Sequence, residues 1–145
     1  MKRPFVWLLI AALMSIGIQV AAANGITIEL NKFEDQDGAC RAYLVFQNQT
    51  DATFSEFKLD LVMFDTDSVI AKRLAVDASP LRPAKTSVKL FDIDGLACSD
   101  ISRILINDVI ACRDQDGERL DCITAVTPVS RNAVAFIKHR FSRDE

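Results

Sequence analysis

An alternation of apolar and polar residues constrains the fold of this chain more than any other feature of its sequence. Ile26, Ile28 and Leu30 are separated by single polar residues, and a similar period of two recurs over 40–47 and 57–64. The side chains of a β-strand point alternately to its two faces, so this pattern is typical of a strand with one buried face. Further runs with the composition of strands are Val69–Val76, Thr86–Ile93, Ile101–Cys112 and Cys122–Thr127.

Short segments rich in Asp, Gly, Asn and Pro separate these runs and predict turns. They cover 34–38, 48–53, 65–68, 77–85, 94–99 and 114–117. Seven short strands with turn signals every 8 to 15 residues predict an all-β fold, an immunoglobulin-like antiparallel sandwich. We expect the core strands to end near Thr127, and the sequence leaves 128–145 open between a helix and a strand.

The N-terminal residues have the three parts of a secretory signal peptide. Lys2 and Arg3 precede an apolar run, which is followed by small residues up to Ala23. We therefore expect cleavage of 1–23, which leaves a single domain over 24–145 in the periplasm or outside the cell. The alternative is a membrane anchor, but the apolar run of about 14 residues is shorter than the roughly 20 that span a bilayer. No transmembrane segment is expected in the mature chain.

The chain has four cysteines, Cys40, Cys98, Cys112 and Cys122. An even number in an exported domain of this size predicts two disulfides, for which the sequence alone permits three connectivities. Cys112 and Cys122 flank a predicted hairpin turn, so we expect them to pair across it and Cys40 to pair with Cys98. The alternative is a thiol oxidoreductase or a metal site, but the chain has no Cys-x-x-Cys and a single histidine, His139.

Pairs of Asp residues close to a Gly recur along the chain. The weak candidates for a calcium site are Asp35 and Asp37 in one turn, and Asp114 and Asp116 in another. Calcium prefers about six to eight oxygen ligands, whereas each motif offers only two neighbouring carboxylates. Because Asp accepts backbone N–H bonds in turns and Gly adopts positive φ there, turn formation is the favoured interpretation. The sequence therefore predicts neither a metal site nor a cofactor.

Charge and residue types argue against several classes of function. The chain has 20 acidic and 17 basic residues, and two of the basic residues lie in the expected signal peptide, so the mature net charge is −5. This balance argues against nucleic acid as a partner. Nucleophilic catalysis needs a base beside the nucleophile, and the single histidine lies between two basic residues rather than beside an acid. We therefore expect that the protein is not an enzyme.

The C-terminal end differs from the rest of the chain in charge. Residues 131–145 contain four basic and two acidic residues, whereas residues 24–130 are net acidic. We expect this end to contact a partner through Phe136, Ile137, Lys138, Arg140 and Phe141. The alternative is a packed terminal strand with a solvated basic end. If the end serves only for contact, removal of residues 138–145 leaves the melting temperature nearly unchanged.

Part of the chain resembles the FxLYD-type immunoglobulin-like domains of bacterial envelope proteins. The resemblance rests on the turn after Asn48, on 57–67 with its aromatic-Asp turn, on the Pro-containing loop at 81–83 and on the strand 86–91. The chain departs from that pattern in its four cysteines and in Ser68, where Gly is usual. The whole chain is also similar to a group of small exported proteins of alphaproteobacteria. These resemblances imply an envelope domain and supply no catalytic or binding residue.

The sequence thus predicts a non-catalytic interaction module of the periplasm, which binds an envelope or periplasmic protein. A β-sandwich presents loops and edge strands to partners, and the chain has no recognisable catalytic constellation. The alternative is a carrier of a small ligand or of calcium that uses the acidic turns.

Overall fold

The computed structural model describes residues 25–139, which form nine strands and two short 3-10 helices but no α-helix. The elements are β1 (Ile26–Gln36), β2 (Ala39–Asn48), β3 (Glu56–Phe64), β4 (Ile70–Asp77), β5 (Lys85–Asp94), η1 (Cys98–Asp100), β6 (Arg103–Asp114), β7 (Gly117–Glu118), η2 (Cys122–Ala125), β8 (Val126–Ser130) and β9 (Ala135–Lys138). The expected signal peptide, 1–23, lies outside the described residues. Within residues 25–139, no helix is long and apolar enough to cross a membrane.

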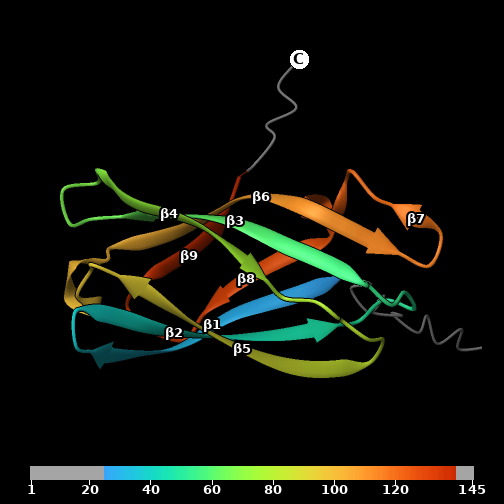
Figure 1. The fold of residues 1–145 in the computed structure, drawn as a ribbon, viewed down its shortest axis with the longest axis horizontal. Coiled ribbons are helices and arrows are strands. Elements are labelled where there is room, and N and C mark those ends of the chain that lie inside the picture. Colours follow the sequence, from blue (N-terminus) through green and yellow to red (C-terminus); the bar gives the residue numbers. More distant parts are fainter. Residues whose placement is uncertain (1–24, 140–145) are drawn as a thin grey trace, which may run out of the picture.

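Two sheets pack face to face, one above the other in Figure 1. Sheet 1 has the order β5-β2-β1-β8, and sheet 2 has the order β4-β3-β6, with β7 and β9 paired to different parts of β6. The pairs β1–β2, β2–β5, β3–β4 and β3–β6 are antiparallel. In an immunoglobulin domain, strands A, B and E lie in one sheet and strands C and F in the other, and β1, β2, β5, β3 and β6 follow this division. The predicted all-β sandwich is confirmed.

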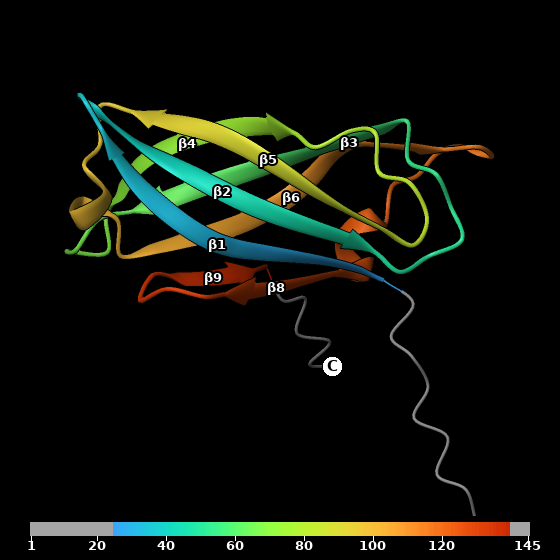
Figure 2. The same cartoon turned by 90° about the horizontal axis from the view of Figure 1, so that it is seen from below.

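Two parallel pairings close one side of the sandwich. β8 pairs with β1, and β9 pairs with β6. Figure 2 shows β8 and β9 side by side along that side, joined by a turn that takes the chain from sheet 1 to sheet 2. The expectation that the core strands end near Thr127 is therefore wrong, since the sheets continue to Lys138. Strands of four and five residues are too short to show a clear period of two in the sequence.

The core lies between the sheets and is built by the predicted alternation. Ile26, Ile28 and Leu30 of β1 are fully buried. Directly paired residues of neighbouring strands share a face, so Leu44, which lies opposite Leu30 on β2, also points inward and is fully buried. Other large buried side chains come from both sheets, namely Phe46, Phe57, Leu59, Leu61, Met63, Ile93 and Ile104. Burial of each such side chain contributes about 1.5–3 kcal/mol.

Both disulfides lie where the chain passes from one sheet to the other. Cys40 of β2 is bonded to Cys98 of η1, on the connection from β5 to β6. Cys112 of β6 is bonded to Cys122 of η2, on the connection from sheet 2 to β8 in sheet 1. The predicted pairing is confirmed, and none of the four cysteines is free.

Asn48 fastens the end of β2 to the two loops beside it. Its buried side chain donates from Nδ2 to the carbonyls of Ala52 (2.8 Å) and Leu81 (3.3 Å). Its Oδ1 accepts hydrogen bonds from the backbone N–H and the hydroxyl of Thr50. The buried amide therefore satisfies its own donors and acceptor while it orders both loops.

The side of the sandwich opposite β8 and β9 is open, and its edge strands carry inward-pointing lysines. Lys72 of β4 and Lys89 of β5 are directly paired with fully buried core residues of β3 and β2, so both lie on inner faces. Lys72 Nζ donates to the carbonyl of Asp94 (3.0 Å), and Lys89 Nζ donates to that of Ser79 (3.1 Å). Inward-pointing charges on edge strands oppose edge-to-edge pairing with another sheet.

Replacement of both lysines should open this edge to self-association. We expect the double variant Lys72→Val with Lys89→Val to form larger species than the wild type, because apolar β-formers then extend the inner faces to the edge. Sedimentation velocity at matched protein concentration measures these species. The control is Ala75→Val, which adds apolar volume to the outward face of β4. A double variant that sediments like this control would contradict the protective role of the lysines.

Candidate functional site

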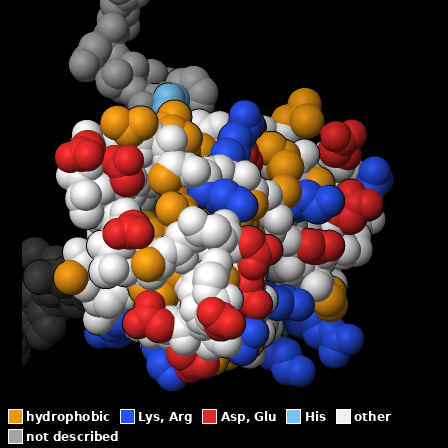
Figure 3. Space-filling model, turned by 60° about the vertical axis from the view of Figure 1, so that its left-hand side comes forward, with side chains coloured by type: hydrophobic (Ala, Val, Ile, Leu, Met, Phe, Trp, Pro, Cys, Tyr) orange, Lys and Arg blue, Asp and Glu red, His pale blue; other side chains and the backbone are white. Residues whose placement is uncertain are grey.

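The acidic residues that were considered for calcium do not come together. Asp35 and Asp37 lie at the β1–β2 turn, at the end of the sandwich that Figure 3 brings forward. Asp114 and Asp116 lie at the β6–β7 turn, at the opposite end in Figure 1. Acidic and basic side chains are interspersed on the surface in Figure 3. Within residues 25–139, no group of three or more His, Cys, Asp or Glu side chains is arranged to hold a metal ion.

The structure describes three of the five C-terminal residues for which a partner contact was predicted, and it places them in different surroundings. Phe136 of β9 is buried in the core, where a partner cannot reach it. Ile137 lies on the opposite face of the same strand and is exposed. Arg140 and Phe141 lie outside the described residues. The burial of Phe136 favours the alternative of a packed terminal strand for residues 135–138.

Lys138 forms hydrogen bonds to the backbone within the protein. Its Nζ donates to the carbonyls of Ile123 (3.2 Å), Thr124 (3.3 Å) and Val126 (2.6 Å). The last carbonyl groups of a helix have no partner within the helix, so a cation is favourable beside them. Lys138 therefore holds η2 and the start of β8 against β9, and it is engaged inside the protein.

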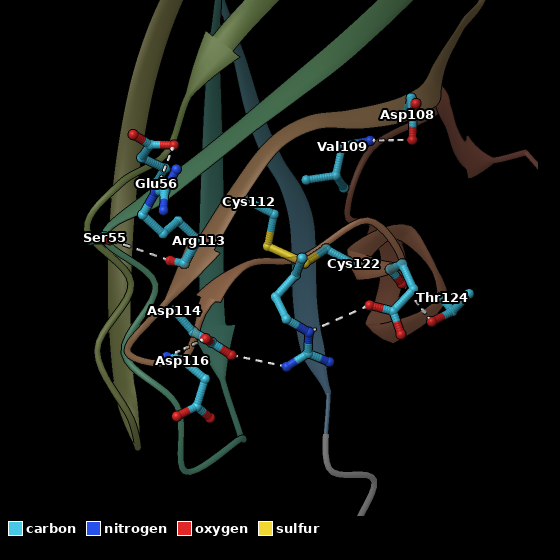
Figure 4. The surroundings of a disulfide bond; sticks show 12 residues. Ser55, Glu56, Asp108, Val109, Cys112, Arg113, Asp114, Asp116, Cys122 and Thr124 are labelled. Carbon is cyan, nitrogen blue, oxygen red and sulfur yellow. Dashed lines mark hydrogen bonds and ion pairs between the residues drawn. A yellow bond between two sulfur atoms is a disulfide. The ribbon is translucent and has the colours of Figure 1, made fainter.

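The segment that runs from β7 to the start of η2 is held in place from both ends. The Cys112–Cys122 disulfide joins β6 to η2 at the base of the loop, as Figure 4 shows. The backbone N–H of Arg119 donates to the carbonyl of Cys112 (2.8 Å). Closure of a ring between the two cysteines restricts the conformations of the residues inside it. We refer to residues 117–121 as the braced loop.

Asp114 holds the braced loop from its inner side. Its carboxylate is buried and accepts the backbone N–H of Asp116 (2.8 Å) and the guanidinium of Arg119 (2.9 Å; Figure 4). These contacts lower the pKa of Asp114, the N–H of Asp116 most strongly, because both stabilise the charged form. Arg119 Nε also lies 3.5 Å from Asp121 Oδ1. The guanidinium thus links two carboxylates on either side of residue 120.

Leu120 is exposed and lies between Arg119 and Asp121. Its side chain is 89% exposed, more than that of any other large apolar residue in the described part of the chain. The ion pairs of Arg119 and Asp121 hold the backbone on both sides of it. The braced loop therefore presents an apolar side chain from a backbone that needs little further ordering on binding.

The sequence analysis did not select Leu120 as a contact residue. A single leucine between charged residues has the same pattern as one inward-facing position of a strand, so the sequence does not reveal its exposure. The one sequence signal near this place was the predicted Cys112–Cys122 pairing across a turn, which does not single out Leu120.

A hollow of about 180 Å³ lies beside the braced loop. Its lining includes Thr50, Ala52, Phe54, Arg119 and Thr124. Pockets that enclose small molecules have volumes of about 300–1,000 Å³. The surface around the braced loop is therefore suited to contact with a macromolecule rather than to enclosure of a small ligand.

Protonation of Asp114 should loosen the braced loop. Because its pKa is lowered in the folded protein, its stabilising contribution is present above the ordinary Asp value of about 3.9 and is lost as the pH falls through the lower folded-state value. We expect Asp114→Asn to melt at a lower temperature than the wild type at neutral pH, and the difference to shrink below about pH 4. Thermal unfolding followed by circular dichroism over this pH range measures the difference.

Asp116→Asn is the matched control, because the Asp116 carboxylate points away from Asp114 in Figure 4. This variant should follow the pH dependence of the wild type. A difference between Asp114→Asn and the wild type that stays constant from neutral to acidic pH would show that Asp114 ionisation does not support the loop.

Removal of the Lys138 ammonium should destabilise the whole domain. In Lys138→Met, the carbonyls of η2 and β8 lose the hydrogen bonds of the ammonium while an unbranched aliphatic side chain is kept, so we expect the free energy of unfolding to fall by about 1–3 kcal/mol. Urea denaturation measures the change. Lys32→Met, which removes one exposed ion pair with Glu34, should have a smaller effect. Equal effects of the two substitutions, or full stability of a chain shortened to residue 137, would contradict this role of Lys138.

Comparison with known proteins shows a likeness in fold. No protein-family model matches the chain, and no curated protein matches it. The solved structure of IrmA from Escherichia coli is similar, with a TM-score of 0.56 over 72% of this chain and 90% of that chain. The two sequences are 10% identical, so the likeness concerns the fold alone. The chain is therefore similar to IrmA in the architecture of its β-sandwich.

Proposed function

We propose that the protein is a non-catalytic interaction module of the cell envelope, which binds a protein partner through the braced loop. The observation that carries this proposal is the 89% exposure of Leu120 on a loop that a disulfide and ion pairs hold in place. Large apolar side chains that are solvated in the free protein and become buried on binding contribute strongly to association.

The compartment is inferred from the disulfides. Two disulfides indicate an oxidising environment, because thiols are kept reduced in the cytosol. The expected signal peptide over residues 1–23 also supports export from the cytosol. We therefore place the proposed function in the periplasm or at the cell exterior.

The chemistry of the braced loop indicates the kind of partner. Leu120 requires an apolar recess, and the charged groups of Arg119 and Asp121 on either side of it would form a polar rim. Because the backbone is already held, binding loses less conformational entropy than it would with a free loop. The separation of the acidic turns at opposite ends of the sandwich gives no support to the alternative of a calcium carrier.

Site-specific photocrosslinking in the protein's own host tests the proposal. A benzophenone side chain at Glu118, an exposed position of β7, should form an adduct with an envelope protein on irradiation. In a Leu120→Ser background the same probe should give at least about fivefold less adduct, because the apolar anchor is lost while the disulfide and the ion pairs remain.

A probe at Asp67, an exposed position in the β3–β4 turn at the other end of the sandwich, is the control. It should not form the same adduct. The proposal fails if the adduct from position 118 is unchanged by Leu120→Ser, or if the probe at position 67 forms it equally well.

A further inference from the structure

The outer face of sheet 1 carries an exposed apolar block on two neighbouring strands. Val45 and Tyr43 of β2 are directly paired with Val88 and Leu90 of β5, so the four side chains share one face. This face is turned toward the viewer in Figure 2. Val88 is 53% exposed and Leu90 is 52% exposed. We refer to Tyr43, Val45, Val88 and Leu90 as the apolar block.

The charged residues around the apolar block are neutralised in pairs. Three pairs lie on this face, between Arg41 and Asp92 (2.8 Å), between Lys32 and Glu34 (2.9 Å), and between Arg131 and Glu29 (2.9 Å). The rows from β1 to β5 that surround the block therefore have no net charge, although the chain as a whole has a net charge of −3.

The other rim of the apolar block is polar and uncharged. It is formed by one row of directly paired residues on the four strands of sheet 1, namely Thr27, Gln47, Thr86 and Thr127. An apolar centre with a polar rim is the arrangement of a protein interface.

We propose that the outer face of sheet 1 binds a second copy of this chain, with the two apolar blocks facing each other across a twofold axis. In such an isologous contact each patch meets an identical patch, so any net charge on the patch would repel its copy. A patch whose charges cancel within itself avoids this repulsion, even though two copies of an acidic protein repel each other elsewhere. Neutrality also gives no attraction to a nucleic acid or to an anionic membrane.

The outer face of sheet 2 has charged side chains at its centre. Asp60 is buried there beneath Arg73 (2.8 Å) and Asn107 (2.7 Å), so its charge is balanced. Arg103 lies over the ring of Phe64, 4.1 Å from the centroid, and forms no ion pair with a residue of 25–139. Charged side chains therefore cover the centre of this face, where sheet 1 has its apolar block. The choice of sheet 1 follows from this difference between the centres of the two faces.

Sedimentation equilibrium of the mature protein from about 10 µM to about 500 µM tests the proposal. The wild type should show a monomer–dimer equilibrium, and Val88→Thr with Leu90→Thr should weaken it at least about tenfold, because each substitution acts twice in a twofold dimer. Leu120→Thr is the matched control, since it removes the same kind of side chain from the braced loop, and it should leave the equilibrium unchanged. A wild type that stays monomeric, or equal weakening by the control, would overturn the proposal.

A charge exchange tests the twofold contact without truncating the apolar block. Arg41→Asp gives the patch two extra negative charges and Asp92→Arg gives it two extra positive charges, and both side chains are partly exposed, so folding should be preserved. Each variant alone should dimerise more weakly than the wild type, whereas an equimolar mixture should associate again. A mixture that associates no better than either variant alone would overturn the proposal. This dimerisation test does not depend on the proposed function, because binding through the braced loop is measured separately, by the photocrosslinked adduct at position 118.

Discussion

The covalent fixing of two connections between the sheets, the one before β6 and the one after β7, is the constraint on which the rest of the structure depends. Cys40–Cys98 ties sheet 1 to the connection that leads into β6, and Cys112–Cys122 ties the other part of β6 to the connection that leads out of it. In the loop-entropy model such rings stabilise a fold by about 3–4 kcal/mol each. β6 is therefore held near both ends, and it supplies the edges on which β3, β7 and β9 pair. The braced loop follows from the second of these rings.

The two sides and the two outer faces of the sandwich differ in how they meet the solvent. One side is closed by β8 and β9, and the other is left open but carries Lys72 and Lys89 on its inner faces. The outer face of sheet 2 is covered in part by its own Arg73, Asn107 and Arg103 side chains. The outer face of sheet 1 keeps apolar side chains in water, as does Leu120. The proposed contacts rest on the apolar block and on Leu120, whose side chains are exposed in the free domain.

The C-terminal residues show how a basic, aromatic segment can support a fold rather than bind a partner. Phe136 completes the core from β9, and the Lys138 ammonium donates to three carbonyls of η2 and the start of β8. The same residues that differ in charge from the rest of the chain thus hold the closing strand in place. Their contribution reaches the braced loop, because η2 carries Cys122.

The sequence by itself determined the all-β class, the turns, most strand positions and the disulfide pairing. These properties depend on local alternation, on turn residues and on the placement of four cysteines, all of which are readable along the chain. Only the tertiary structure decided the parallel places of β8 and β9, the exposure of Leu120 and the pairing of the charges around the apolar block. The reason is that each of these depends on residues that meet from distant parts of the chain. Arg41 and Asp92 are 51 residues apart, and Glu29 and Arg131 are 102 residues apart, so their charges cancel only after the strands have paired.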